Sequence, residues 1–205
     1  MNLTIHPLTS DLWPALEDLF GKSGASNGCW CMYWRIGAEY HKRPREKNRN
    51  AFRKIVTKGP PPGLLAFDGE RAVGWCQLTP RDQLPWLDHT RALKPVDDMP
   101  VWSISCFYVR RGYRKQGVMR ALIAAALTEA KRANAHTLEA YPVDTARRNR
   151  EVLQMFSLAQ LRRSGVPDSR PLRGACCLAR SCAMICRGLH YDLGARKHEA
   201  PFHFL

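Results

Sequence analysis

Short apolar runs and helical periods alternate along the first part of the chain. Leu3–Leu8 is an apolar-rich run that predicts a first strand, and the next period predicts a helix from a cap at Ser10 to Phe20. Arg45–Lys58 is a basic stretch of helical character. It ends at Gly59 and three prolines, which cannot continue a helix. The pattern therefore begins with one strand followed by two helices.

The middle of the chain carries a hairpin signal. Gly63–Phe67 and Ala72–Leu78 are apolar runs of strand length, and the Asp68–Arg71 segment between them contains a glycine suited to a tight turn. Thr79–Pro100 is a proline-containing excursion for which we expect one helical turn near Trp86. Two paired strands and an irregular connection are predicted here.

Val101–Asp144 is the most informative stretch. It contains an apolar run, a short loop rich in Gly and basic residues, an amphipathic helix and a second apolar strand. Asn134 suits the C-terminal end of the helix because Asn tolerates the left-handed conformation common there. One helical face is apolar and consists of Met119, Leu122, Ile123, Ala126, Leu127 and Ala130.

The loop between the apolar run and the helix has the composition of an anion site. Amides at a helix N-terminus have no partner within the helix, and the helix dipole favours negative charge there. Glycine permits close approach of a ligand, and basic side chains neutralise it. The segment is neither a Walker A loop nor a Rossmann fingerprint. A pyrophosphate cradle and an ordinary basic surface turn both fit Arg110, Arg111, Arg114, Lys115 and Gly117.

The order strand, loop, helix and strand over Val101–Asp144 resembles the acetyl-CoA-binding core of the GNAT superfamily of N-acetyltransferases. That family carries an Arg/Gln-x-x-Gly-x-Gly/Ala loop before the helix. Arg114 and Gly117 match it, whereas Met119 replaces the final small residue, a departure that could narrow the cradle.

The resemblance implies an α/β (α+β) fold, in which helices flank a mixed, mainly antiparallel twisted sheet in a single domain over residues 1–145. The expected order is β-α-α-β-β-β-α-β. Family members continue into another helix and two further strands. We find no clear strand pattern after Asp144, so 146–205 are predicted to be an atypical basic segment rich in Cys and Arg.

The same resemblance implies that acetyl-CoA is the co-substrate. Main-chain groups of the apolar run would hold its pantetheine arm and polarise the thioester, and the loop would hold the pyrophosphate. The implied cofactor-binding residues are Phe107, Tyr108, Val109, Arg111, Gly112, Arg114, Lys115, Gln116, Gly117 and Val118.

Candidates for proton transfer lie on the last predicted strand. Glu139 and Tyr141 alternate and should share one face, and Asp144 ends the strand where the acceptor should enter. A solvated strand residue remains an equal interpretation for Glu139. Cys106 invites a covalent mechanism, but a small core residue is the favoured interpretation because the sequence identifies no His neighbour.

The segment after the first helix is the expected acceptor site. Trp30 and Tyr33 could stack on a flat or apolar group, and Arg35 could bind a carboxylate. Packing at the edge of the core is the alternative for these aromatics, and it is slightly favoured for Trp34.

Charge sets the last 60 residues apart. Residues 1–145 carry a net charge of +7, and 146–205 carry another +7 together with four of the eight cysteines. Two explanations stay open: a shift of reading frame after about Asp144, or a divergent and poorly ordered C-terminus. Displaced by one base, codons for Gln160–Pro167 can encode the missing family pattern. Cys176, Cys177, Cys182 and Cys186 lack a convincing zinc spacing, so no metal is predicted.

The implied reaction is acetyl transfer by direct attack of an unidentified amine, either a small molecule or a peptide. The net charge of +14 and the basic run Lys42–Arg53 leave two alternatives, a nucleic-acid-binding module and an inactive acetyl-CoA-binding remnant. No nucleic-acid motif is visible, so nucleic acid is disfavoured as a partner.

Without a signal peptide or an apolar run of about 20 residues, we expect a cytoplasmic protein with no membrane partner. Monomer and homodimer both stay open.

Overall fold

The computed structural model describes all residues except 26, 96–97, 99, 136, 142–188 and 193–205. The strands are β1 Leu3–Pro7, β2 Gly63–Asp68, β3 Arg71–Pro80, β4 Val101–Val109, β5 Thr137–Ala140 and β6 Leu189–Asp192. The helices are α1 Trp13–Phe20, α2 Tyr33–Ile36, α3 Glu39–Lys42, α4 Arg45–Lys58 and α5 Val118–Arg132. Short 3-10 helices occupy Ser10–Leu12, Arg81–Gln83, Pro85–His89, Arg91–Leu93 and Arg111–Tyr113.

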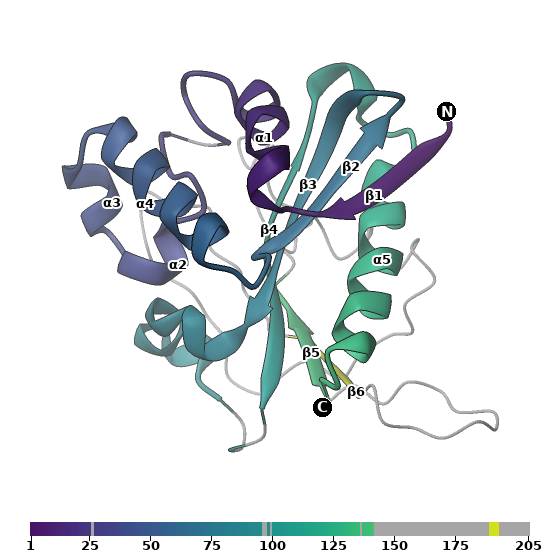
Figure 1. The fold of residues 1–205 in the computed structure, drawn as a ribbon. Coiled ribbons are helices and arrows are strands. Elements are labelled where there is room, and N and C mark those ends of the chain that lie inside the picture. Colours follow the sequence, from purple (N-terminus) through teal and green to yellow (C-terminus); the bar gives the residue numbers. More distant parts are fainter. Residues whose placement is uncertain (26, 96–97, 99, 136, 142–188, 193–205) are drawn as a thin grey trace, which may run out of the picture.

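The described strands form one sheet in the order β1-β2-β3-β4-β5-β6. Every neighbouring pair is antiparallel except β4 and β5, which run parallel because α5 crosses over between them. Figure 1 shows α5 on one side of the sheet and α1 to α4 on the other. The predicted mixed, mainly antiparallel sheet flanked by helices is confirmed.

Alternation of side chains along the strands supplies a core to each helical layer. Leu64 and Ala66 of β2 pack in the cluster under α5, whereas Leu65 and Phe67 pack in the cluster under α1 and α4. A third, smaller cluster lies beneath α2 and consists of Trp34, Leu84, Leu87, Leu93 and Tyr141.

The predicted amphipathic helix α5 packs closely on β3. A Cβ atom added to Gly74 would lie 2.5 Å from Cγ1 of Val118, so glycine allows the start of α5 to approach the sheet. Leu122 is fully buried one turn later. After the helix, Asn134 has a φ of +55°, the left-handed conformation expected for it. The position of the loop before α5 is therefore set by contacts with the sheet.

Two helical predictions need correction. The first helix begins at Trp13 and not at a cap on Ser10, because a 3-10 turn precedes it and no side chain caps it. Pro14 stands in the first turn of α1, where a missing N–H costs no helical bond. The excursion after β3 contains three 3-10 helices where one turn near Trp86 was expected.

The expectation of no strand after Asp144 is wrong over Leu189–Asp192. This segment forms β6 and pairs antiparallel with β5. The sequence LHYD alternates for only two periods, too short to be recognised inside a basic segment. The predicted boundary near residue 145, the frameshift hypothesis and the four C-terminal cysteines lie outside the described residues.

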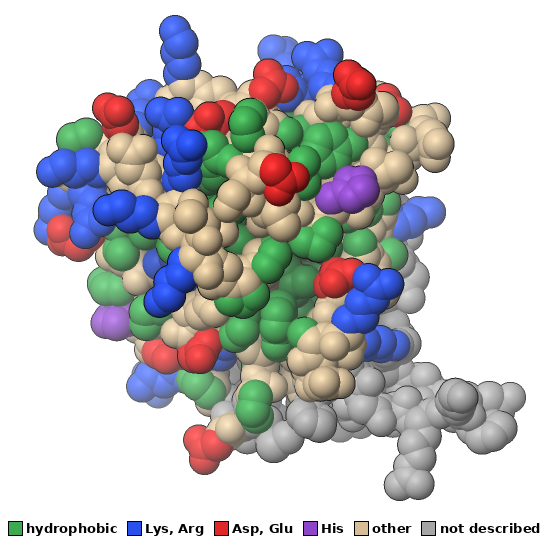
Figure 2. Space-filling model, in the orientation of Figure 1, with side chains coloured by type: hydrophobic (Ala, Val, Ile, Leu, Met, Phe, Trp, Pro, Cys, Tyr) green, Lys and Arg blue, Asp and Glu red, His purple; other side chains and the backbone are tan. Residues whose placement is uncertain are grey.

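Basic side chains gather over α3 and α4, where Figure 2 shows a group of Lys and Arg. Helix α4 alone contributes Arg45, Lys47, Arg49, Arg53, Lys54 and Lys58. None of the helices that the structure describes combines the length and apolar character needed to cross a membrane.

Leu122→Ala should lower the free energy of unfolding by about 2–5 kcal/mol, because truncation leaves a cavity between α5 and the sheet. Thr128→Ala, an exposed change on the same helix, should alter it by less than about 0.5 kcal/mol. Urea unfolding of both variants measures the difference. Equal losses would contradict the packing of α5 described above.

Candidate functional site

Strands β4 and β5 separate halfway along β4. The two strands pair only from Val101 to Ile104, where β5 reaches Ala140 and ends. On its other edge β4 continues to pair with β3 as far as Val109. The register between β3 and β4 skips Ser105, which forms a bulge that changes the direction of the strand.

The separation changes the surroundings of the main chain of β4. The N–H of Arg110 donates to the carbonyl of Val73 on the β3 side, with an N–O distance of 2.9 Å. Because successive N–H groups of a strand point to opposite edges, those of Phe107 and Val109 face the edge that β5 has left. Among the described residues, no strand covers that edge beyond Ile104.

The loop after β4 ends at the exposed N-terminus of α5. Gly117 is its N-cap, with a φ of +87° that favours glycine. The N–H of Ala121 bonds to the carbonyl of Gly117 at 3.0 Å, so Val118, Met119 and Arg120 have no helical acceptor for their N–H groups. A Cβ at Gly117 would meet nothing within 4 Å, which shows open space beside the turn.

The loop is held by its own side chains. Nε of Arg114 donates to the carbonyl of Val109 at 3.3 Å, and Nε2 of Gln116 donates to that of Gly112 at 2.8 Å. The Met119 side chain packs against the cluster under α5. Exposed cations beside the helix amides make this junction suited to an anion, and they are Arg111, Arg114 and Lys115.

On the face of the sheet opposite α5, a buried network surrounds Glu139. Its Oε1 accepts hydrogen bonds from Arg81 NH1 at 2.6 Å, from the Ser103 hydroxyl at 2.5 Å and from the Tyr141 hydroxyl. Arg81 NH2 also contacts Asp88 at 2.7 Å. The structure thus brings Glu139 and Tyr141 together on one face, as their alternation predicts.

The pKa of Tyr141 is shifted in this network. Burial, and then the charge of Glu139, raises the pKa of Tyr141 well above its usual value. The third predicted catalytic residue, Asp144, lies outside the described residues. Sequence reasoning missed Arg81 and Ser103. A carboxylate inside the apolar run TLEAY signals that a cation must be buried with it, but does not identify which one.

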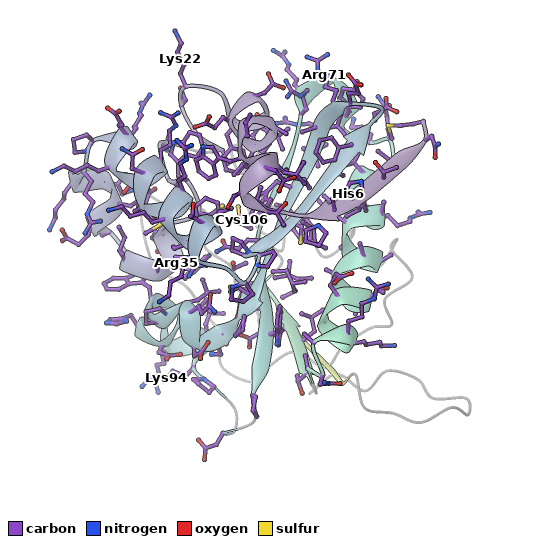
Figure 3. The ribbon with its side chains drawn as sticks, viewed as in Figure 1. His6, Lys22, Arg35, Arg71, Lys94 and Cys106 are labelled. Atoms are coloured by element: carbon purple, nitrogen blue, oxygen red, sulfur yellow. The ribbon has the colours of Figure 1, made fainter. Side chains whose placement is uncertain are left out.

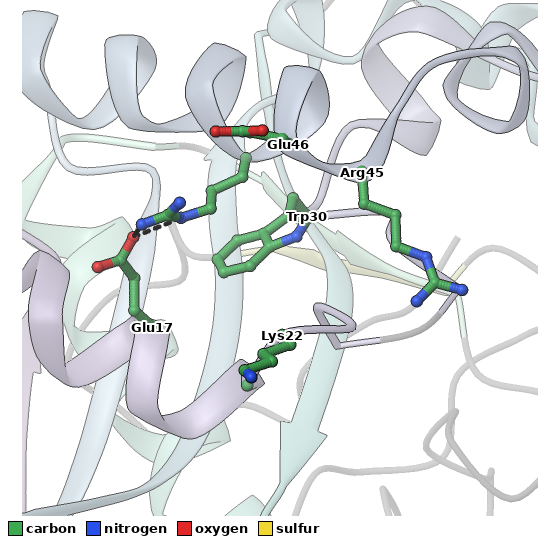
Figure 4. A pocket seen from close by; sticks show the side chains of 7 residues that line it. Glu17, Lys22, Trp30, Arg45 and Glu46 are labelled. Carbon is green, nitrogen blue, oxygen red and sulfur yellow. Dashed lines mark hydrogen bonds and ion pairs between the residues drawn. The ribbon is translucent and has the colours of Figure 1, made fainter.

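Trp30 is a core residue with one side on a surface hollow. It is 2% exposed, and its ring stacks on Trp13 at a centroid distance of 5.9 Å. Figure 4 shows the hollow between α1 and α4, crossed by the ion pair of Glu17 and Arg49. The other lining residues are Gly21, Lys22, Arg45 and Glu46.

The remaining predicted acceptor residues lie in α2. Tyr33 is half-buried, with its ring 4.6 Å from that of Trp34 in an edge-to-face arrangement. Trp34 is buried and packs on Tyr141, the core-edge position favoured for it. NH1 of Arg35 donates to the carbonyl of Gln83 at 3.0 Å. Figure 3 shows Arg35 on the α2 side of the sheet, the side on which Cys106 lies.

Three thiols meet beneath this segment. Cys31 contacts Cys106 and accepts a hydrogen bond from the Trp75 indole at 3.2 Å, while Cys29 accepts one from the N–H of Tyr33. Burial, followed by the contact with Cys106, raises the pKa of Cys31 well above its usual value. All four cysteines among the described residues are free thiols. No group of His, Cys, Asp and Glu in this part of the chain has the arrangement of a metal site.

The chain is similar to known acetyltransferases. Residues 27–157 match the acetyltransferase (GNAT) family. No curated protein sequence matches the chain significantly. Among solved structures, the histone acetyltransferase HPA2 and related acetyltransferase of Corynebacterium glutamicum has a TM-score of 0.55 at 18% identity, over 93% of this chain and 96% of that one.

Two further structures share the fold at lower identity. The NatC complex bound to Gag peptide and CoA has a TM-score of 0.55 at 12% identity, over 94% of this chain and 99% of that one. Aminoglycoside N-acetyltransferase AAC(6')-Iy in complex with CoA has a TM-score of 0.52 at 12% identity, over 88% and 96%.

Arg81→Gln should lower the free energy of unfolding by about 3–5 kcal/mol, because it leaves the carboxylate of Glu139 buried without its cation. Asp88→Asn removes the exposed partner of the same arginine and should cost less than about 1 kcal/mol. Chemical denaturation of the two variants provides the comparison. A similar small loss of unfolding free energy in both variants would show that the ion pair of Arg81 and Glu139 is not required for stability.

Proposed function

Because the chain belongs to the GNAT family of acetyltransferases, we propose that it transfers the acetyl group of acetyl-CoA to an amine by direct attack. The observation that supports this most strongly is the junction of β4 and α5. It combines amides that have no acceptor within the helix, a glycine in the left-handed region and exposed cations. Such a junction suits the diphosphate of the coenzyme.

The residues of the junction fit the coenzyme. The amides of Val118, Met119 and Arg120 would bind the diphosphate, assisted by Arg114 and Lys115. The edge of β4 that β5 leaves offers main-chain groups of Phe107 to Val109 to the pantetheine arm. Open space beside Gly112 and Gly117 leaves room for a ligand against the main chain. The other predicted contacts, with Arg111 and Gln116, belong to the same loop.

The chemistry depends mainly on positioning. The amine nitrogen attacks the thioester carbonyl carbon, the carbon–sulfur bond breaks, and the sulfur leaves as a thiolate that takes up a proton. Holding both partners in contact supplies much of the acceleration. An N–H of β4, such as that of Val109, would stabilise the negative charge that develops on the carbonyl oxygen.

The network around Glu139 would form one wall of the acceptor side. We assign Glu139 and Tyr141 to positioning, because the carboxylate already accepts three hydrogen bonds and is 1% exposed. An amine must lose its proton before it attacks. Asp144, at the end of the predicted strand, stays a candidate for accepting that proton. Tyr33 of α2 would contact the body of the acceptor from the opposite wall.

The basic surface over α3 and α4 supports one alternative, binding of nucleic acid. It lies on helices of the layer opposite α5, so the two functions can be separated experimentally. Coenzyme A should raise the melting temperature of an acetyltransferase. Salt-sensitive oligonucleotide binding without this effect would favour the alternative, and coenzyme binding without thiol release would indicate an inactive remnant.

Gly117→Ala should weaken coenzyme A binding by about tenfold, because alanine disfavours a φ of +87° by about 1–2 kcal/mol and shifts the helix amides. Gly69→Ala is a matched control: Gly69 also has a positive φ and open space around it, but lies in the β2–β3 turn. It should strain the chain equally and leave the affinity unchanged. Calorimetric titration with coenzyme A measures the affinity of each variant. Equal affinities of the two variants for coenzyme A would argue against the proposed diphosphate site.

A further inference from the structure

Arg35 is a half-buried cation that forms no ion pair with the described residues. Its Nε and NH2 atoms are buried, and neither has a hydrogen-bond partner within the described part of the chain. Only NH1 is engaged, by the neutral carbonyl of Gln83. Burial lowers the pKa of Arg35 from its usual value, which reflects the cost of a guanidinium that no described carboxylate compensates. Buried charges are normally paired.

Gln77 is a buried polar group whose side chain has no partner in the described part of the chain. Its side chain is fully buried in β3, and neither its amide nitrogen nor its oxygen forms a hydrogen bond among the described residues. An amide left in this state costs free energy of folding. Sequence reasoning gave no role to Gln77, because a single Gln in an apolar strand has no recognisable pattern.

A chain of contacts through two cysteines connects the segment of Arg35 with Gln77. Gln77 lies directly opposite Cys106 in the β3–β4 pairing, so the two side chains share a face. The Cys106 thiol contacts Cys31, and Cys31 lies four residues before Arg35 on the same segment of the chain. Cys106 also lies beside the bulge at Ser105, where β4 separates from β5.

We propose that Arg35 and Gln77 form the receptor for a carboxylate carried by the acceptor, so that the preferred substrate is an amine of the amino-acid type. The proposal rests on the acetyltransferase function above and names its substrate class. The Nε and NH2 edge of Arg35 presents two parallel donors, the geometry that binds a carboxylate through both oxygens. Gln77 supplies an amide for a further hydrogen bond to the same molecule.

The charge balance favours a single negative charge. Arg81, the other buried guanidinium of this face, is already engaged by Glu139 and Asp88. The single charge of Arg35, which no described carboxylate balances, matches a carboxylate and undercompensates a phosphate dianion. It also disfavours polycationic acceptors, because a second positive charge near Arg35 would be repelled.

The substrate test compares amines in matched pairs. Each α-amino acid is assayed beside the amine that lacks only its carboxyl group, with inorganic phosphate and an aminoglycoside as further probes. Thiol release from acetyl-CoA gives kcat/KM, and the shift in melting temperature gives binding independently of turnover. The amino acid should exceed its decarboxylated partner by about 10–100-fold, the range for a charge-assisted hydrogen bond. Binding of inorganic phosphate alone, or preference for the amine without carboxylate, would overturn the proposal.

Two variants separate a receptor from a structural role. Arg35→Met removes a guanidinium whose Nε and NH2 have no described partner, and Gln77→Met removes a side-chain amide that has none, each in exchange for an apolar side chain. Both should keep or raise the melting temperature, and both should lower kcat/KM for amino acids by about tenfold or more. Arg43→Met, on an exposed arginine of the neighbouring segment, is the control and should change neither quantity.

The outcomes distinguish failure of the carboxylate receptor from failure of the acetyltransferase function. If the Met variants gain stability and acetylate amino acids as well as the parent protein does, the receptor is refuted while the acetyltransferase function stands. If the parent protein binds coenzyme A but none of the tested amines leads to thiol release from acetyl-CoA, both proposals fail. Loss of amino-acid preference in Arg35→Met, with coenzyme affinity unchanged, is the result we expect.

Discussion

Main-chain groups at two interruptions of secondary structure are the constraint on which this molecule depends. One lies where the pairing of β4 with β5 ends at Ile104, and the other lies where α5 begins after Gly117. Both arise from the backbone, so the side chains around them can vary. That property agrees with a fold shared at 12% to 18% identity.

The two faces of the sheet have different roles. The face under α5 is apolar and holds the loop in position through contacts such as that of Val118 with Gly74. The opposite face has an apolar core of its own and buries polar groups as well. Arg81 and Glu139 balance each other there, whereas Arg35 has no described counter-ion. A protein retains such a cost where a ligand compensates it, and this difference between the two arginines locates the proposed acceptor site.

Much of the fold could be predicted from the sequence because its signals are local. The apolar stripe of α5, the turn at Gly69 and the glycine before the helix each depend on neighbouring residues. The acceptor face could be predicted only in part. Glu139 and Tyr141 share a face by alternation, but Arg81 stands 58 residues from Glu139, and its partnership appears only when the sheet is assembled. Nε and NH2 of Arg35 and the Gln77 amide have no partner among the described residues, and this is a property of packing that no spacing in the sequence reveals.

The most direct measurement is a calorimetric titration of the full chain with coenzyme A and, separately, with pantetheine, which carries the thiol arm without the diphosphate. If the amides at the start of α5 bind the diphosphate, coenzyme A should bind far more tightly than pantetheine, and added salt should weaken the coenzyme alone. Equal affinity for the two compounds, or no heat with coenzyme A, would contradict the assignment of this junction as the coenzyme site.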